Sequence, residues 1–316
     1  MIYKNSIKVL FSNFNIVWKL ALYLLLVFAF GGTLFFFCMN PIVKFISEAG
    51  FFRQIVELYT EFLSSLNLAS ALERLSQIFT NLGLFIKDNI SQIWVYIVLA
   101  SVVLFFLNNL LFNLSHMAVS YSLHFYIGSL TRQGFFESFG DCIGKNLKTQ
   151  FCNFFVSMPI NILYIYLFIV ASRLFDITWF LNIFAVIIIV VGFVILMAFK
   201  YTLLSAWIPS MVVMNHGVCK SFGVGLKITF RRFGHVFRNA IGIILTIIVL
   251  NMFLGMFTFM VGLIISIPIS VVLYNAFGMV VTYEGQGMRY YVDIYNVITP
   301  KKKEDLDKIK DMKFVV

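Results

Sequence analysis

The histidines and cysteines are the residues from which this sequence could build a metal centre. Four histidines are present, and none belongs to a His-x-x-x-His or His-x-x-His-His pattern, which argues against a diiron site of the desaturase type. His116 and His124 are eight residues apart, so they share one helix face but lie too far apart for one metal ion. The cysteines form no C-x-x-C pair and stand at Cys38, Cys142, Cys152 and Cys219. We therefore expect no metal, cofactor or disulfide, and we expect the histidines, His216 and His235 included, to be interfacial or hydrogen-bonded groups.

Catalytic patterns are equally scarce. The sequence has no Gly-x-Ser-x-Gly elbow of a serine hydrolase and no Gly-x-x-x-x-Gly-Lys-Ser/Thr loop for nucleotide phosphates. The centres of its long apolar segments hold no ionisable residue, which argues against a proton-coupled antiporter, a carboxylate-based pump and an aspartyl protease. The sequence thus predicts no catalytic residue.

Asparagines are the polar side chains that do lie within the apolar segments. They are Asn108, Asn109, Asn113, Asn161, Asn182, Asn251 and Asn275. An asparagine can bridge two membrane helices at about 0.6–2 kcal/mol per hydrogen bond. Two interpretations stay open: these side chains hold helices together, or they mark a path for a polar, uncharged substrate.

The densest basic cluster follows the fourth apolar segment. It consists of Lys220, Lys227, Arg231, Arg232 and Arg238. Such residues either set membrane topology or bind phosphate head groups, whose oxygens accept hydrogen bonds from Arg and Lys. The candidates for head-group binding are Lys227, Arg231, Arg232, Arg238, Lys148 and Lys8.

The elements that must position these residues follow from composition. The chain has 316 residues, of which 61% are hydrophobic and 12% charged, and its mean hydropathy is +0.93. Soluble domains hold about 45–50% apolar and about 25% charged residues. The sequence therefore predicts an all-α integral membrane protein.

Stretches of about 20 apolar residues predict six transmembrane helices. They lie near 20–39, 93–115, 152–171, 178–199, 239–258 and 262–283, within a single transmembrane domain of residues 1–299 that precedes a polar tail, 300–316. We interpret Tyr201–Cys219 as an extension of the fourth helix; if it crosses the membrane, the count is seven. The loop 40–92 predicts two amphipathic helices, and the first has Phe51, Phe52, Ile55, Tyr59, Phe62 and Leu66 near one face.

The lysines and arginines predict the orientation. With the N-terminus inside, 19 of them fall on inner segments and 5 on outer segments. Both termini are therefore expected in the cytoplasm of a cell whose plasma membrane holds the protein, with the first helix as an uncleaved anchor. The basic inner face predicts contact with anionic lipids rather than with nucleic acid.

Two short patterns recur along the chain. Lys-x-x-Phe-x-x-Phe begins at Lys8, Lys148 and Lys227, each time before an odd-numbered helix. Gly-x-x-x-Ser-Phe-Gly begins at Gly134 and Gly217, and Met-Val-Val begins at Met211 and Met279. These recurrences predict three two-helix units in parallel orientation; the alternative is a set of basic segments shaped only by topology.

The segment Trp207–Ile241 resembles part of a loosely defined set of bacterial six-helix membrane proteins, which includes the membrane domain attached to some glycerophosphoryl diester phosphodiesterases. The shared features are a proline-containing helix end, a glycine turn and a serine-bearing basic amphipathic helix, here filled by Pro209, Gly217, Ser221, Arg231 and Arg232. The resemblance implies no catalytic activity, because the chain has no room for the phosphodiesterase barrel.

Three functions are compatible with this sequence. A non-enzymatic membrane protein that binds lipids or a membrane-protein partner at the cytoplasmic leaflet accounts best for the basic inner face. A transporter or channel for a neutral or amphiphilic solute accounts for the asparagines, and a lipid-acting membrane enzyme is the third alternative.

The predicted topology can be tested by cysteine accessibility. Single cysteines placed in 40–92 should react with a membrane-impermeant maleimide added from outside, and cysteines in 300–316 should react only after permeabilisation. Labelling of the tail in intact cells would reverse the orientation.

Overall fold

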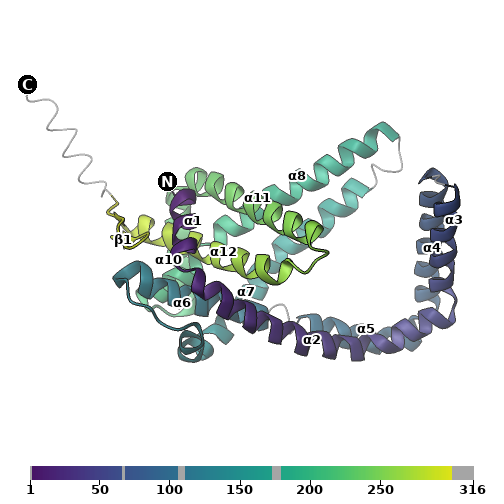
Figure 1. The fold of residues 1–316 in the computed structure, drawn as a ribbon, viewed down its shortest axis with the longest axis horizontal. Helices are drawn as coiled ribbons and strands as arrows, with labels where there is room; N and C mark the ends of the chain where they lie inside the picture. The colour runs from purple at the N-terminus through teal and green to yellow at the C-terminus, as the bar shows by residue number, and fades with distance from the viewer. Residues whose placement is uncertain (1, 66–67, 106–110, 173–178, 301–316) are drawn as a thin grey trace, which may run out of the picture. The chain divides into compact units, whose positions relative to one another are not determined.

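The protein is almost entirely helical (Figure 1). The computed structural model describes residues 2–65, 68–105, 111–172 and 179–300. The helices are, in chain order, α1 (Ile2–Ser12), α2 (Phe14–Glu48), α3 (Phe51–Ser65), α4 (Leu68–Asp88), α5 (Ile90–Phe105), α6 (Asn113–Ser129), α7 (Phe135–Ser172), α8 (Trp179–Leu204), α9 (Trp207–Met214), α10 (Val218–Arg231), α11 (Phe233–Phe257) and α12 (Leu263–Gln286). A short antiparallel pair follows, β1 (Tyr290–Tyr291) with β2 (Val297–Ile298), which the sequence analysis did not predict.

Five helical segments are long and apolar enough to cross a membrane. They are Phe14–Glu48, Phe135–Leu167, Ile189–Met214, Phe233–Phe257 and Leu263–Gln286. A sixth is obtained if Glu73–Asp88 and Ile90–Leu104, which meet at a bend of 100°, count as one span. The chain therefore has the architecture of a multi-pass helical membrane protein.

The predicted second span, 93–115, lies partly outside the described residues. Helix α5 ends at Phe105 and α6 begins at Asn113, and residues 106–110 lie outside the described part of the chain. Among the described residues, the apolar stretch that passes the length test joins α4 to α5.

The uncharged segment Tyr201–Cys219 is divided among three helices. It contains the end of α8, the whole of α9 and the start of α10. Helix α9 has eight residues and is about 12 Å long, too short to cross a bilayer by itself. The segment thus extends α8 and adds no seventh span.

The chain forms two compact units, 1–25 with 109–316 and 26–108. In the second unit, α3 and α4 occupy the loop for which two amphipathic helices were predicted, and they pack against each other. The small core of this hairpin is built from Phe51, Leu58 and Ile78.

The apolar face predicted for α3 is only partly buried. Phe51 is buried, but Phe52, Ile55 and Tyr59 are 41–61% exposed. Leu58, one residue before Tyr59, is buried instead. Helix α4 covers a stripe of α3 that is narrower than the apolar face of α3. The hairpin therefore keeps a large apolar surface uncovered.

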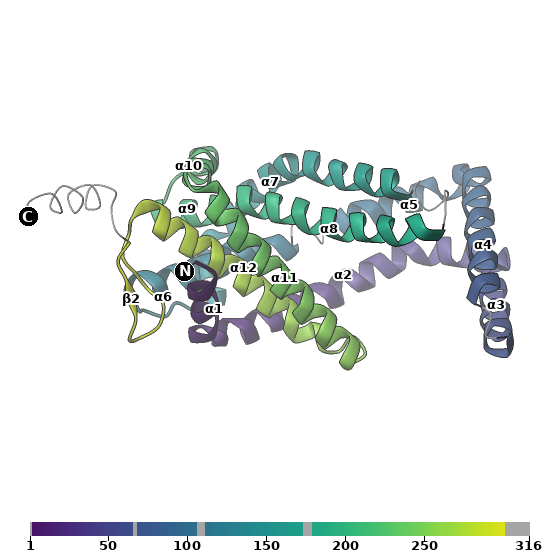
Figure 2. The same ribbon diagram turned by 90° about the horizontal axis from the view of Figure 1, so that it is seen from above.

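Helix α12 is the central helix of the first unit. Its most apolar stretch is 72% buried, compared with 11–28% for the other candidate spans. It contacts α1, α6, α9, α10 and α11, and Figures 1 and 2 show it running beside α1 and α11. A helix that is apolar around its whole circumference is buried when neighbouring helices enclose it on all sides.

Two glycines permit the close packing around α12. A Cβ atom on Gly278 would lie 2.3 Å from the backbone oxygen of Ser205, and one on Gly285 would lie 2.3 Å from Cγ2 of Ile228. Glycine at these positions lets the backbone of α12 touch the junction of α8 with α9 and the side of α10.

Helix α1 is fastened to the segment that follows α12. Asn5 Nδ2 donates to Tyr290 Oη at 2.8 Å, and Tyr290 Oη donates to Glu284 Oε1 at 2.8 Å. Burial, together with the nearby charge of Glu284, raises the pKa of Tyr290. Lys8 Nζ lies 3.8 Å from Asp293 Oδ2, and hydrogen bonds from Asn296 hold the pKa of Asp293 below its ordinary value.

The packing of α12 predicts a stability difference between two glycine substitutions. Gly278→Ala should destabilise the protein by about 1–3 kcal/mol, because the new methyl group overlaps a backbone oxygen that cannot move away. Gly144→Ala is the control: its Cβ would meet nothing within 4 Å, and alanine favours the helix by up to about 1 kcal/mol. Thermal unfolding of both variants in one detergent measures the difference; an unchanged Tm for Gly278→Ala would contradict this packing.

Candidate functional site

The basic cluster predicted from the sequence lies on α10 and the start of α11. Helix α10 buries Ser221, Gly225, Ile228 and Thr229 against the rest of the unit. Its opposite side is left to solvent or lipid and carries the exposed Lys220, Lys227 and Arg231. These three are spaced by seven and four residues, which places them on one helix face. Arg232, between the two helices, and Arg238, on α11, are exposed as well.

A helix break shapes this surface. Arg232 has φ −135° and ψ 34°, so α10 ends and α11 begins on either side of it. Three phenylalanine rings stack across the break: Phe230 with Phe233 at 5.9 Å and Phe233 with Phe237 at 5.6 Å between centroids. Phe230 is 60% exposed. Exposed rings beside exposed cations are the chemistry of an amphipathic helix in a membrane interface.

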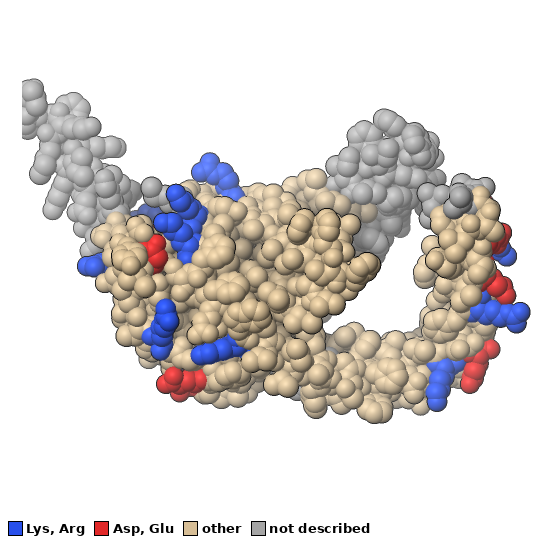
Figure 3. All heavy atoms as spheres, viewed as in Figure 1, with Lys and Arg blue, Asp and Glu red and all other residues tan. Residues whose placement is uncertain are grey.

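The five cations are electrostatically free within the described chain. The ion pairs found there are Lys8 with Asp293, Arg53 with Glu57, and Arg74 with Glu61, so none involves this cluster. Figure 3 shows that blue side chains also gather on one face of the first unit, over the end that holds α1 and β1. The other two candidates differ: Lys8 is half-buried and paired, and Lys148 is exposed on α7.

The described asparagines bind neighbouring helices. Asn275 Oδ1 accepts from Ser120 Oγ at 3.0 Å, and its Nδ2 lies 3.0 Å from His116 Nδ1. Asn251 Nδ2 donates to Ser270 Oγ at 2.9 Å and its Oδ1 accepts from Ser266 at 2.7 Å. These bonds join α12 to α6 and to α11 and give the asparagines a structural role.

The remaining asparagine candidates do not join this group. Asn161 Oδ1 accepts from Lys200 Nζ at 2.9 Å, which links α7 to α8. Asn113 lies at the start of α6, and its backbone oxygen accepts from Gln150 at 3.0 Å. Asn182 belongs to α8, where the structure describes the helix but not this side chain, and Asn108 and Asn109 lie outside the described residues.

The two histidines of α6 both face α12, as their spacing predicts. His124 Nδ1 lies 2.8 Å from Tyr283 Oη, eight residues beyond the contact of His116 with Asn275 on each helix. Because the steps have the same sign, α6 and α12 run parallel. No group of three potential metal ligands occurs among the described residues.

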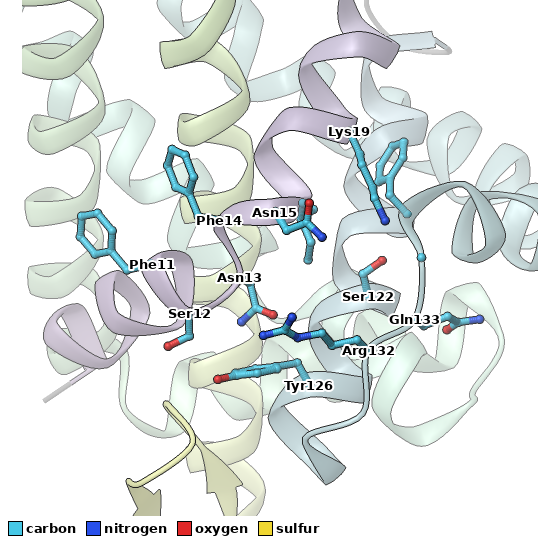
Figure 4. A pocket seen from close by; sticks show the side chains of 13 residues that line it. Phe11, Ser12, Asn13, Phe14, Asn15, Lys19, Ser122, Tyr126, Arg132 and Gln133 are labelled. Atoms are coloured by element: carbon cyan, nitrogen blue, oxygen red, sulfur yellow. The ribbon is translucent and has the colours of Figure 1, made fainter.

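A cavity of about 280 Å³ lies elsewhere in the first unit (Figure 4). Its wall is formed by the break between α1 and α2, by one face of α6 and by the loop that leads into α7. Lys19 descends from α2 toward Ser122, and Arg132 reaches from the loop to lie between Asn13 and Tyr126 (Figure 4). None of the thirteen lining residues is acidic.

Lys19 and Arg132 are among the 19 basic residues of the predicted inner segments, but nothing in the sequence places them together. They are 113 positions apart, and no shared motif connects them. The cue that could have marked the site is the polar run Ser12-Asn13-Phe14-Asn15 directly before an apolar helix, since Ser and Asn favour helix ends over helix interiors.

Comparisons with known proteins add no assignment. No protein family, curated protein or solved structure matches this chain.

The hydrogen bonds of Asn275 predict a cost for its removal. Asn275→Ala leaves the buried Ser120 hydroxyl without its acceptor and His116 without its partner, and should lower stability by about 1–3 kcal/mol. Asn81→Ala, at an exposed position of α4, should change stability by less than about 0.5 kcal/mol. Chemical unfolding in mixed micelles compares the two; equal stability would mean that Asn275 does not join α12 to α6.

Proposed function

We propose that this chain is a non-enzymatic multi-pass protein of the cell membrane that binds anionic lipid head groups at the cytoplasmic leaflet. The observation that carries the proposal is the surface of α10 and α11, where five exposed cations lie beside a stacked run of phenylalanines that includes the exposed Phe230. A basic residue near an anionic bilayer contributes about 1 kcal/mol, and salt screens that contribution. The orientation that places this surface inside, with both termini cytoplasmic, is part of the proposal and draws on the 19-to-5 distribution of basic residues.

We also propose that the chain contains three repeated helix pairs. The first phenylalanine of each Lys-x-x-Phe-x-x-Phe copy is strongly exposed, at 69% for Phe11, 67% for Phe151 and 60% for Phe230. Two copies cross a helix break at the fifth residue after the lysine, at Asn13 and at Arg232. Helix α7 continues without a break through the corresponding position, Asn153.

The other repeated pattern supports the same proposal. Gly134 and Gly217 each precede the first residue of a helix, and their backbone oxygens accept at 2.9 Å from Ser138 and Ser221, both buried. The helices that end before these segments close with a left-handed residue, Leu130 after α6 and Asn215 after α9. The parallel course of α6 and α12 agrees with a repeat whose units point the same way.

The relation to the membrane domains attached to glycerophosphoryl diester phosphodiesterases stays a proposal that depends on Trp207–Ile241. In the structure this segment contains α9, α10 and the start of α11, so it coincides with the basic surface. A transporter is the weaker candidate, because Asn251 and Asn275 are engaged by neighbouring helices. A lipid-acting enzyme has the least support, since the histidines of α6 bond to an amide and a phenol.

Neutralising the surface should weaken lipid retention. The variant Lys227→Gln, Arg231→Gln, Arg232→Gln should lose up to about 3 kcal/mol of binding to anionic lipid while it still inserts, because the apolar helices supply far more than that. Native mass spectrometry after extraction from a bilayer of mixed anionic and zwitterionic lipid counts the lipids retained.

The matched control removes three cations from the other unit. Arg53→Gln, Arg74→Gln, Lys87→Gln changes the net charge equally but leaves α10 intact. Equal lipid retention by the wild type and the α10 variant, with correct topology, would refute head-group binding; an inverted α11 would show that the residues only set topology.

A further inference from the structure

We propose that the cavity between the α1–α2 break and the α6–α7 loop binds a phosphate group, with Lys19 and Arg132 as its two cationic ligands. This site is distinct from the surface of α10, which contributes no residue to its wall. The proposal therefore stands or falls independently of lipid binding by α10.

The two cations approach the cavity from segments on different sides. Lys19 comes from α2, one residue before the predicted first span, and Arg132 comes from the loop between α6 and α7 (Figure 4). Neither side chain makes a hydrogen bond or ion pair with a residue that the structure describes, so the Lys19 amino group and the Arg132 guanidinium remain available. Arg presents a planar fork of N–H donors and Lys a single strong positive charge, and both are common ligands of phosphate oxygens.

Neutral donors complete the wall. Asn13 is 7% exposed and sits beside the Arg132 guanidinium, while Ser122 is 2% exposed and lies below the Lys19 amino group (Figure 4). The Asn13 amide donates to Val9 O at 2.9 Å, which fixes its orientation, and the Ser122 hydroxyl lies 3.1 Å from that of Ser138. The two neutral side chains are thus held in place, whereas Lys19 is half-buried and Arg132 is exposed.

The local electrostatics favour an anion. No lining residue is acidic. Two carboxylates contact lining residues and keep their negative charge: Asp141 accepts from Gln133 Nε2 at 3.0 Å, and Glu137 accepts from the backbone N–H of Gly134 at 3.4 Å. The N-terminal ends of α2 and α7 border the cavity, and the partial positive charge of a helix N-terminus adds to that of the side chains. Within the wall, Lys19 and Arg132 together match the charge of a phosphate monoester.

The size and location indicate which phosphates fit. A volume of about 280 Å³ is slightly below the usual range for small-molecule sites, about 300–1,000 Å³, and admits one phosphate with a small substituent. Lys19 lies one residue before the predicted first span, where the head groups of the bilayer are expected. The phosphate can belong to a lipid head group or to a soluble molecule, and the chemistry of recognition is the same.

The test compares Lys19→Gln, Arg132→Gln and the double variant with the wild type in phosphatidylcholine nanodiscs. Inorganic phosphate is titrated by calorimetry in one arm, and retained phosphatidic acid is counted by native mass spectrometry in the other. Each single variant should weaken binding on the order of tenfold and the double variant on the order of a hundredfold. Arg289→Gln, which removes one exposed cation outside both sites, is the matched control and should bind like the wild type.

The two arms identify the source of the phosphate. A loss of inorganic phosphate binding in the variants supports a soluble ligand, and a loss of phosphatidic acid alone supports a lipid head group. Binding in neither arm, or equal binding by the wild type and the double variant, overturns the proposal. The Lys227, Arg231, Arg232 variant should keep its inorganic phosphate response, so a failure of the α10 surface is distinguished from a failure of the cavity; helical circular dichroism confirms that each variant is folded.

Discussion

The contact between Gly278 of α12 and the backbone of Ser205 is the constraint on which the first unit depends. It lets α12 lie against the junction of α8 and α9, and Gly285 extends the same contact to α10. A side chain at either position would push the helices apart and open the core that α12 fills. Because α12 is enclosed, its polar groups must find partners among its neighbours. Asn275 bonds to His116 and Ser120, Ser266 bonds to Asn251, and Glu284 bonds to Tyr290.

This close packing also decides which residues are left outside. Helix α10 packs Ser221, Gly225 and Ile228 against the core, so the cations on its opposite side point outward. Small and hydroxyl-bearing residues on the inner side keep the helix close to α9 without a wide apolar stripe. The exposed charge of α10 is therefore a consequence of how the helix packs, as well as of topology.

Sequence reasoning predicted the features that depend on local periodicity. The apolar stretches now lie in α2, α7, α8, α11 and α12, and the basic face of α10 and the helical hairpin of 51–88 are present. It failed where tertiary packing decides which residues are buried and which residues lie together. The buried position of Leu58 depends on where α4 crosses α3. The cavity could not be predicted for the same reason, because Lys19 and Arg132 are far apart in the sequence and line one cavity only in the folded chain.

The two helix breaks at Asn13 and Arg232 are the places at which we propose two kinds of phosphate contact. In both places a Lys-x-x-Phe-x-x-Phe segment turns from an amphipathic helix into an apolar one. At Asn13 the loop before α7 closes over the turn and supplies Arg132, so a bounded cavity results. At Arg232 the residue of the break is itself the cation and is exposed, so the same turn produces an open surface. A bounded site selects a single phosphate by shape, whereas an open one responds to the charge density of the bilayer. The difference lies in what covers the break, which explains why equivalent sequence patterns need not share a ligand.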